Sequence, residues 1–280
     1  MKVGINLLLW TANPSFREHE SLLEDLSGWG FDAFEIGVSG LSSAEISKFA
    51  KKADELGLDR TVLDVFLAAE ADTISEDPEK RNKAVEIVKD SIRKTVDIGA
   101  TVFSGPIYQG LVNTTQTGPS EDEWNRAVDA LRECALFAKE QGVKIAAEPL
   151  NRFEAYLVTS VDQAYRFAMD VGVDSFGILA DTHHSNIEEY DTAASWSKVM
   201  DRIYNVHISE NNRGIPGEGH AIPPEVFAAL QNGGYDGYLT IEAFNANVPE
   251  IAPLLRLWRS FVDDESIIAK KGLEFIRSHV

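Results

Sequence analysis

Four side chains that could bind a metal stand at the ends of four consecutive apolar runs. The runs are KIAAEPL, GILADTHH, YNVHIS and LTIEAF, and they carry Glu148, Asp181, His207 and Glu242. Taken singly, a carboxylate at a strand end is often a loop anchor, and a lone histidine is more often a hydrogen-bonded core residue than a ligand. Brought together at one depth, three carboxylates and one imidazole would form an unstable cluster without a cation. The pattern therefore predicts a metal site.

The ligand types limit the choice of metal. Three oxygen ligands, one nitrogen ligand and no thiolate suit a fairly hard divalent ion with open coordination positions better than a closed structural zinc site. We expect one ion per chain, with manganese as the first choice and cobalt or magnesium as alternatives.

The four residues can meet only if their strands lie side by side and parallel. Short β-rich runs alternate with amphipathic stretches along the chain, with no linker or low-complexity tract between them. The eight predicted strands are Lys2 to Trp10, Ala33 to Ser39, Thr61 to Leu67, Thr101 to Tyr108, Lys144 to Leu150, Phe176 to His183, Tyr204 to Ser209 and Gly237 to Phe244.

Strict alternation of strands and helices indicates a parallel sheet with helices outside it. Eight units close into a barrel more economically than they leave an open sheet with two edges. We therefore predict an α/β fold in which residues 1–280 form one (β/α)8 TIM barrel domain, with a doubly wound open sheet as the alternative. In such a barrel the functional face lies at the carboxyl ends of the strands, where the four side chains stand.

The expected helices carry recognisable start signals and apolar stripes. Capping boxes are predicted at Ser42-x-x-Glu45, Ser120-x-x-Glu123 and Ser160-x-x-Gln163. In the fourth helix an apolar stripe at three-and-four spacing is predicted to pack on the strands. Its members are Trp124, Ala127, Val128, Leu131 and Ala135.

Composition argues against several classes of protein. Hydrophobic content of 44% and charged content of 25% are typical of soluble globular proteins, and no run approaches the roughly 20 apolar residues of a membrane span. We expect a cytoplasmic protein without membrane insertion. A net charge of -19 would repel nucleic acid. The single cysteine, Cys134, lies in an apolar helical pattern and is predicted to be a buried, inert thiol.

Five segments give the chain a resemblance to a known family. They are GPIY at 105–108, EPLNRFE at 148–154, DTHHSNIEE at 181–189, HISENNRGIPGEGH at 207–220 and IEAF at 241–244. On these segments the chain resembles the ketose 3-epimerases of the D-tagatose, D-psicose (allulose) and L-ribulose 3-epimerase type, within the xylose-isomerase-like barrel superfamily. The resemblance covers nearly the whole chain, and the segment at 207–220 is its most specific part.

The resemblance implies roles for individual residues. It implies that the four residues named above coordinate one metal, and that Glu148 and Glu242 also form the acid/base pair. It further implies that Glu154, His184 and Arg213 hold the sugar hydroxyl groups. Because adjacent residues of extended backbone point to opposite sides, at most one of His183 and His184 is expected to face the site, and the motif selects His184. The resemblance also implies a homodimer or homotetramer.

Other residues near the predicted barrel mouth are weaker candidates. Trp10, Phe66 and Tyr108 could form an apolar wall for a sugar, and we retain Trp10 and Tyr108 as substrate contacts. Glu35 could reach the mouth or could instead support a neighbouring side chain or loop, and it is not included among the predicted site residues.

The charge around Arg213 bears on the type of sugar. Glu210 and Glu218 flank Arg213 in the sequence and would oppose a phosphate group. A free sugar is therefore favoured over a sugar phosphate.

The chemistry of the expected reaction follows from the two glutamates. Removing a proton from carbon next to a carbonyl requires stabilisation of the enediolate, which a metal can provide, and inversion requires a second carboxylate on the opposite face. We therefore predict C3 epimerisation of free ketoses such as D-fructose/D-psicose, D-tagatose/D-sorbose or L-ribulose/L-xylulose. The alternatives are an aldose-ketose isomerase acting on hydroxypyruvate or a pentose, a metal-dependent endonuclease, and a non-catalytic sugar-binding protein. Charge and ligand count oppose the endonuclease.

Overall fold

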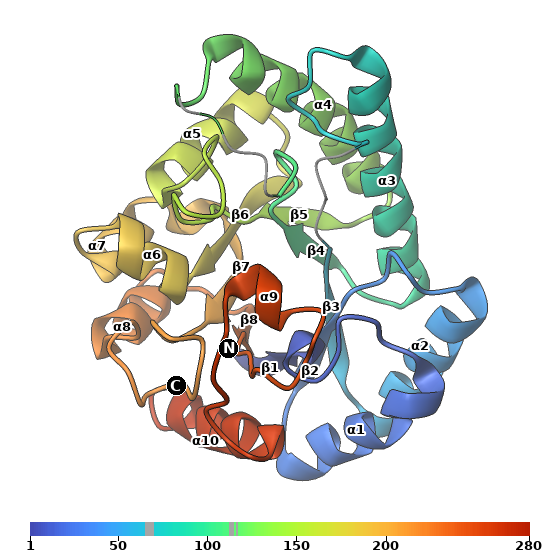
Figure 1. The fold of residues 1–280 in the computed structure, drawn as a ribbon, viewed down its shortest axis with the longest axis vertical. Coiled ribbons are helices and arrows are strands. Elements are labelled where there is room, and N and C mark those ends of the chain that lie inside the picture. The colour runs from blue at the N-terminus through green and yellow to red at the C-terminus, as the bar shows by residue number, and fades with distance from the viewer. Residues whose placement is uncertain (65–69, 112–114, 116) are drawn as a thin grey trace.

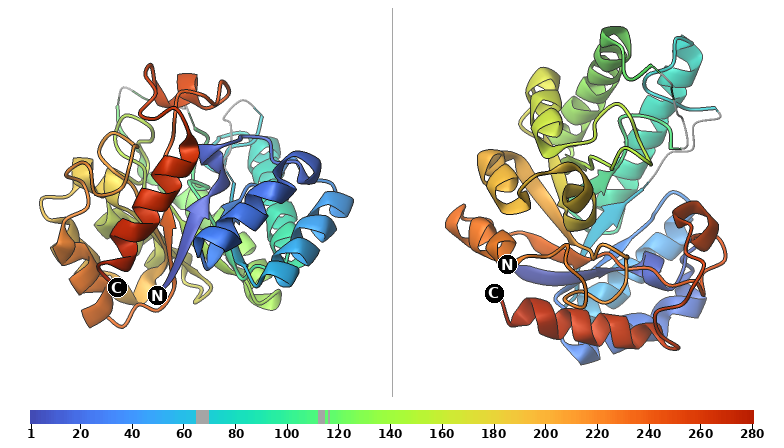
Figure 2. Two further views of the ribbon diagram at one scale, coloured as in Figure 1. Left: turned by 90° about the horizontal axis from the view of Figure 1, so that it is seen from below. Right: turned by 60° about the vertical axis from the view of Figure 1, so that its left-hand side comes forward.

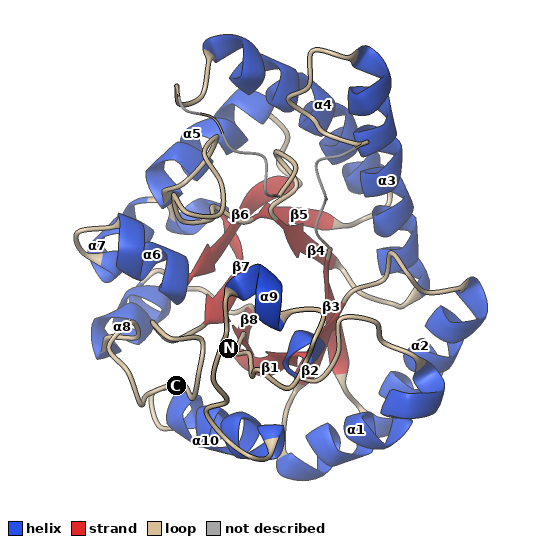
Figure 3. Ribbon diagram, in the orientation of Figure 1, coloured by secondary structure: helices blue, strands red, loops and turns tan. Residues whose placement is uncertain are grey.

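The alternating pattern of the sequence folds into a closed barrel of parallel strands. The computed structural model describes residues 1–64, 70–111, 115 and 117–280. Within these residues each strand pairs in parallel with the next along the chain, and β1 pairs with β8 to close the ring (Figure 3). The strands are β1 Lys2–Asn6, β2 Ala33–Ile36, β3 Asp59–Leu63, β4 Val102–Gly105, β5 Lys144–Ala147, β6 Phe176–Asp181, β7 Ile203–Ile208 and β8 Tyr238–Ile241. The predicted (β/α)8 barrel is confirmed.

Helices surround the ring of strands and bury their apolar faces against it (Figure 1). The α-helices are α1 Phe16–Trp29, α2 Ser43–Leu56, α3 Pro78–Asp97, α4 Glu121–Glu140, α5 Val161–Val171, α6 Thr182–Glu188, α7 Thr192–Lys198, α8 Pro224–Asn232, α9 Ala252–Leu255 and α10 Glu265–Arg277. Two short 3-10 helices, η1 Leu7–Leu9 and η2 Met200–Arg202, follow β1 and precede β7.

Helix α4 has both the N-terminal cap and the buried apolar stripe that its sequence predicts. Ser120 and Glu123 form a complete capping box, and the five predicted stripe residues are all buried. Cys134 on the same face is fully buried, and burial raises the pKa of its thiol to about 12, so it is not a nucleophile at neutral pH. At Ser160 the predicted box is incomplete, because the side chain of Gln163 accepts from the backbone of Thr159 instead.

Most strands end earlier than their apolar runs suggest. The first was predicted to reach Trp10, but the side chain of Asn6 accepts the backbone N–H of Leu8 and the chain turns into η1. The sixth was predicted to reach His183, but Asp181 caps the start of α6 through its side chain. Side-chain caps at the strand ends therefore override β propensity. The predicted third strand extends into residues 65–67, which lie outside the described residues.

The two ends of the barrel have different roles. Both chain termini lie at one end, and the segment around α9 lies at the other (Figure 2). The second end holds the carboxyl ends of the strands, and α9 lies near the centre of the ring when it is viewed from that end (Figure 1). Among the described residues, no helix is both long enough and apolar enough to cross a membrane.

Candidate metal centre and sugar pocket

The four predicted ligand side chains meet inside the barrel. Glu148 follows β5, Asp181 ends β6, His207 lies in β7 and Glu242 follows β8. One ligand atom from each lies within 4.8 Å of the others, and all four residues are buried. Nδ1 of His207 lies 3.4 Å from Oε1 of Glu242 and 3.6 Å from Oδ2 of Asp181. It also lies 3.7 Å from Oε1 of Glu148.

The sheet register brings these side chains to one level. Asp181 and His207 are direct partners across β6 and β7. The backbone N–H of Glu148 donates to Gly105 at 3.0 Å, and that of Glu242 donates to Ile208 at 3.3 Å, so both glutamates continue the ladder by one residue beyond their strands. Backbone pairing, rather than loop conformation, therefore sets the positions of the carboxylates.

The cluster carries an electrostatic conflict. Burial and the neighbouring Glu242 carboxylate raise the pKa of Glu148 well above its usual range. Burial also acts against ionised Glu242, but His207 and Arg213 outweigh it and lower the pKa of Glu242 to about 2. The pKa of His207 is raised, because nearby carboxylates outweigh the effect of burial. The negative charge of the three carboxylates is therefore only partly offset by His207 and Arg213.

Two atoms of the cluster indicate what would resolve this conflict. In the described part of the chain, Oε1 of Glu148 and Nδ1 of His207 are the buried side-chain polar atoms that have no hydrogen-bond partner. Buried polar atoms are rarely left unpaired in native proteins. Both orphaned atoms belong to the four-residue cluster, so a divalent ion bound there would satisfy both. The three oxygen donors and one nitrogen donor fit such an ion.

Arg213 reaches into this cluster from the loop after β7. Its Nη1 atom donates to Glu242 at 2.7 Å, to Ser209 at 3.0 Å and to Asp181 at 3.1 Å. Its backbone adopts a left-handed conformation with φ of 62°, which costs about 1 kcal/mol or more for a residue other than glycine. The buried ion pairs therefore hold this side chain in one place.

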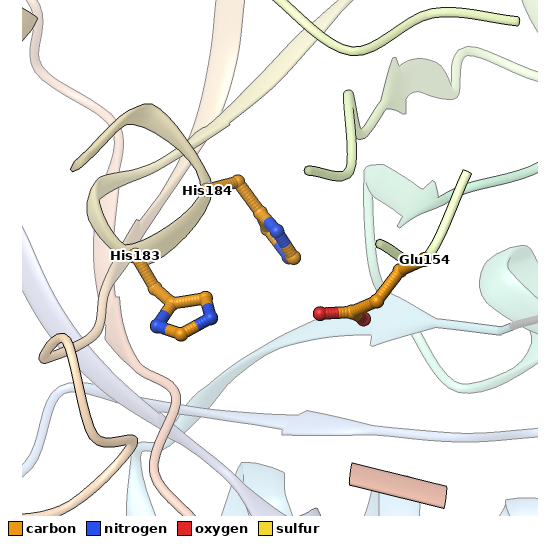
Figure 4. Close-up of side chains that lie close together, drawn as sticks. All are labelled: Glu154, His183 and His184. Atoms are coloured by element: carbon orange, nitrogen blue, oxygen red, sulfur yellow. The ribbon is translucent and has the colours of Figure 1, made fainter. Parts of the chain in front are cut away.

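A second group of candidate ligands lies beside the first. Figure 4 shows the Glu154 carboxylate pointing toward the rings of His183 and His184, and one ligand atom from each of the three residues lies within 4.8 Å of the others. Of the two histidines only His184 lines the cavity, as predicted, but both lie in the first turn of α6 and not in the extended backbone from which that expectation was argued. Adjacent helical residues diverge by only about 100°. The pKa of His183 is lowered to about 4 by burial and by the Arg213 guanidinium, so its ring is neutral at neutral pH.

This second group is better suited to hydrogen bonding than to metal binding. The Nδ1 atom of His184 faces the backbone N–H of Asn151 at 3.0 Å, and its Nε2 atom lies 2.9 Å from Nη2 of Arg213. A neutral imidazole has one acceptor nitrogen, and in His184 that nitrogen faces an N–H donor, so it is not free for an ion. Glu154 accepts from the side chain of Asn151 at 2.7 Å and keeps capacity for a further donor, such as a hydroxyl group.

A cavity of about 340 Å³ opens above the four-residue cluster at the carboxyl end of the barrel. Five of the predicted site residues line it, and most of the other lining residues form an apolar wall. The predicted residues in the lining are Glu148, Glu154, His184, Arg213 and Glu242. The apolar wall includes Leu8, Leu63, Pro106, Phe244, Ile251 and Leu254. A volume of this size is at the lower end of the range for small-molecule sites.

Two predicted substrate contacts are not brought into this cavity. Tyr108 is fully buried, and its hydroxyl donates to the carbonyl of Val158 and accepts from the backbone of Leu150. Trp10 packs against the hydrophobic core and is not part of the cavity lining. Tyr108 is therefore a packing residue, and Trp10 lies partly buried outside the cavity lining. Phe66 lies outside the described residues.

The two glutamates that flank Arg213 in the sequence also do not face the cavity. Glu210 accepts backbone N–H groups of Gly217 and Ala221 and holds the loop, and Glu218 pairs with Lys271 at the surface. The negative charge of the cavity comes instead from the glutamates of its own lining, and these carboxylates, rather than Glu210 and Glu218, would oppose a phosphate group.

Sequence reasoning left one buried carboxylate out of the site. Glu35 in β2 is fully buried, and its Oε2 atom lies 2.7 Å from Nε2 of His207. The signal that could have found it is the single glutamate within the apolar run AFEIG, because a buried carboxylate must have partners.

Comparison with known proteins agrees with this geometry. Residues 23–279 match the model of the family described as xylose isomerase-like TIM barrel. The chain belongs to this family. The resemblance inferred from its motifs is therefore confirmed at the level of the family.

Relatives with known names match this chain over nearly its whole length. An L-ribulose 3-epimerase from Mesorhizobium japonicum is 30% identical, covering 98% of this chain and 93% of the relative. A D-psicose 3-epimerase from Enterocloster bolteae is 31% identical, with coverage of 99% and 95%. The solved D-allulose 3-epimerase from Methylomonas sp., in complex with D-allulose, superimposes with a TM-score of 0.92 at 27% identity, covering 100% of this chain and 97% of that one. With epimerases as its relatives, this chain is an enzyme of the isomerase class.

Proposed function

We propose that the protein is a metal-dependent ketose 3-epimerase that acts on free ketoses. The observation that carries this proposal is the buried cluster of Glu148, Asp181, His207 and Glu242, two of whose polar atoms have no hydrogen-bond partner. The relatives, which are named L-ribulose 3-epimerase and D-psicose 3-epimerase, support the same reaction. We further propose manganese as the ion, a homodimer or homotetramer as the assembly and the cytoplasm as the location.

The four residues of the cluster would hold the ion. When bound, the ion would act as a Lewis acid and stabilise the negative charge that develops on the carbonyl oxygen of the sugar. Glu148 and Glu242 extend from β5 and β8, on either side of the β6–β7 pair, and both line the cavity. One group, ionised at the start, would accept the proton from C3, and the other, protonated at the start, would deliver its proton to the opposite face of the same carbon, so the two exchange protonation states. The C3–H bond breaks and reforms with inverted configuration.

The remaining polar residues of the cavity would orient the sugar. Arg213 can donate to hydroxyl oxygens, and Glu154 can accept from hydroxyl groups. The Nε2 atom of His184 lies 3.6 Å from Oε1 of Glu148 and 2.9 Å from Nη2 of Arg213. The apolar wall would exclude water from the carbanion-like intermediate. Water could otherwise protonate C3 on either face, and the configuration of the product would no longer be controlled.

Isotope exchange tests the proposed reaction and separates it from the isomerase alternative. D-Fructose, D-tagatose and L-ribulose would each be incubated with the Mn²⁺-loaded enzyme in heavy water and the recovered sugars examined by NMR. We expect deuterium at C3 together with the C3 epimer, and none at C1. Deuterium at C1 together with an aldose product would overturn the epimerase assignment. Enzyme treated with a chelator serves as the control and should leave all three sugars unlabelled.

A further inference from the structure

The carboxylate of Glu35 lies at the centre of a buried polar network inside the barrel. Its Oε1 atom accepts from Thr61 Oγ1 and from Asn205 Nδ2, both at 2.9 Å. Its Oε2 atom accepts from Asn6 Nδ2 at 2.9 Å and lies 2.7 Å from Nε2 of His207. The partners come from β1, β3 and β7, so the network spans the interior of the barrel.

The orientation of each amide in this network is set by its own second contact. Oδ1 of Asn6 accepts the backbone N–H of Leu8, which leaves Nδ2 to face Glu35. Oδ1 of Asn205 accepts the backbone N–H of Val206, which again leaves Nδ2 for the carboxylate. Glu35 is therefore surrounded by donors, and a carboxylate with this set of partners acts only as an acceptor.

The tautomer of His207 follows from that arrangement. Since Glu35 accepts, Nε2 of His207 must carry the hydrogen and donate it. In the neutral ring the lone pair is then on Nδ1, the orphaned atom that faces Glu148, Asp181 and Glu242.

We infer that Glu35 is a positioning residue that holds His207 with Nδ1 ready to bind the ion, and that it thereby sets the affinity of the site for metal. The inference rests on the proposed metal site. Carboxylates that accept from the outer nitrogen of a ligand histidine raise the basicity of the ring as well as fixing its orientation. The sequence separates the two residues by 172 positions, so the pair exists only in the folded barrel.

The variant Glu35→Gln tests this inference through metal affinity rather than activity. The amide has no negative charge and one acceptor oxygen instead of two, so either His207 or Asn205 must face an N–H group. We expect the dissociation constant for Mn²⁺, measured by calorimetry on metal-free protein, to rise about 10- to 100-fold. An affinity within twofold of wild type would overturn the inference, because a purely structural role would lower the melting temperature without weakening binding.

The matched control is Asp64→Asn. Asp64 is also a buried carboxylate, directly after β3, but it accepts from Ser91 and from the backbone of Val38 rather than from a proposed ligand. Its Mn²⁺ affinity should stay within about twofold of wild type, and a loss as large as that of Glu35→Gln would overturn the inference.

A second measurement needs no variant. NMR of the histidine ring nitrogens in metal-free wild-type protein should show a hydrogen on Nε2 of His207, and an unprotonated Nε2 would overturn the inference. Because neither measurement uses a sugar, both are independent of the carbon at which the enzyme acts.

Discussion

Glu148 and Glu242 carry the same chemical group into the site, but their surroundings differ. Oε2 of Glu242 accepts from Arg213 at 2.7 Å, whereas Oε1 of Glu148 has no hydrogen-bond partner. Arg213 therefore restrains the carboxylate of Glu242 more than that of Glu148. Kinetic measurements can distinguish the roles of these residues, because the two glutamates are proposed to move protons and Arg213 to hold the sugar.

Replacing either proposed proton carrier should stop turnover without removing the pocket. We expect Glu148→Gln and Glu242→Gln each to lower kcat at least about a hundredfold, because proton transfer by a positioned group contributes about 10²- to 10⁴-fold. Steady-state kinetics at saturating Mn²⁺ measure the effect. The control is Glu218→Gln at the surface, which should leave kcat unchanged. Near-normal turnover of a metal-loaded Glu148 or Glu242 variant would remove that residue from the acid/base pair.

Replacing Arg213 should have a different kinetic signature. Loss of a donor that holds hydroxyl oxygens weakens binding of the sugar in the ground state as well as in the transition state. We expect Arg213→Ala to raise KM by about tenfold or more, with a smaller change in kcat. Arg166→Ala is the control, since Arg166 lies on the outer helix α5 against Trp124. A fall in kcat at unchanged KM would contradict the proposed role.

At the scale of the elements, close packing between neighbouring strands positions the carboxylates. Gly105 ends β4 with φ of 141°, and a Cβ atom there would collide with the backbone oxygen of Asp64. The carbonyl of Gly105 also accepts the backbone N–H of Glu148. Glycine is needed at this point because the backbone after β3 approaches too closely for any side chain.

The substitution Gly105→Ala should therefore be strongly destabilising. We expect a loss of at least about 3 kcal/mol in the free energy of unfolding, because the neighbouring group is backbone and cannot move aside easily. Denaturant titration followed by circular dichroism measures it. In the matched control, Gly28→Ala on the exposed face of α1, a Cβ atom meets nothing within 4 Å, and stability should rise by up to about 1 kcal/mol. Equal stabilities of the two variants would refute this account.

At the scale of the whole molecule, the proposed ion links four strands that lie far apart in the sequence. The cluster joins β5, β6, β7 and β8 at a point where burial opposes uncompensated negative charge. An ion that binds only the folded barrel stabilises it by mass action. The metal should therefore affect the melting of the entire barrel and not only the reaction.

Adding Mn²⁺ to metal-free protein should raise the melting temperature. At a concentration about a hundredfold above the dissociation constant the gain is about 2.7 kcal/mol, which corresponds to roughly 5 °C for a chain of this size. Differential scanning calorimetry with and without a chelator measures the shift. The gain should shrink as the pH falls, because the raised pKa values of Glu148 and His207 let protons compete with the ion. An identical melting curve with and without Mn²⁺ would argue against a preformed site.

The sequence by itself determined the barrel and the four residues of the proposed metal site. Strand–helix alternation has few compact solutions, and the carboxyl ends of parallel strands must meet at one end of a barrel. Glu148, Asp181, His207 and Glu242 could therefore be grouped from their positions at the ends of apolar runs, before any distance was known.

Only the tertiary structure decided which side chains support that cluster and which merely lie near it. Tyr108 turned out to be a packing residue and Glu35 a partner of His207, because the direction of a side chain near a strand end depends on the packing of distant strands. His183 and His184 share one helical turn because the Asp181 side chain caps α6, a contact that β propensity does not reveal. Local patterns encode strand and helix, but burial and hydrogen bonding across the barrel depend on residues far apart in the chain.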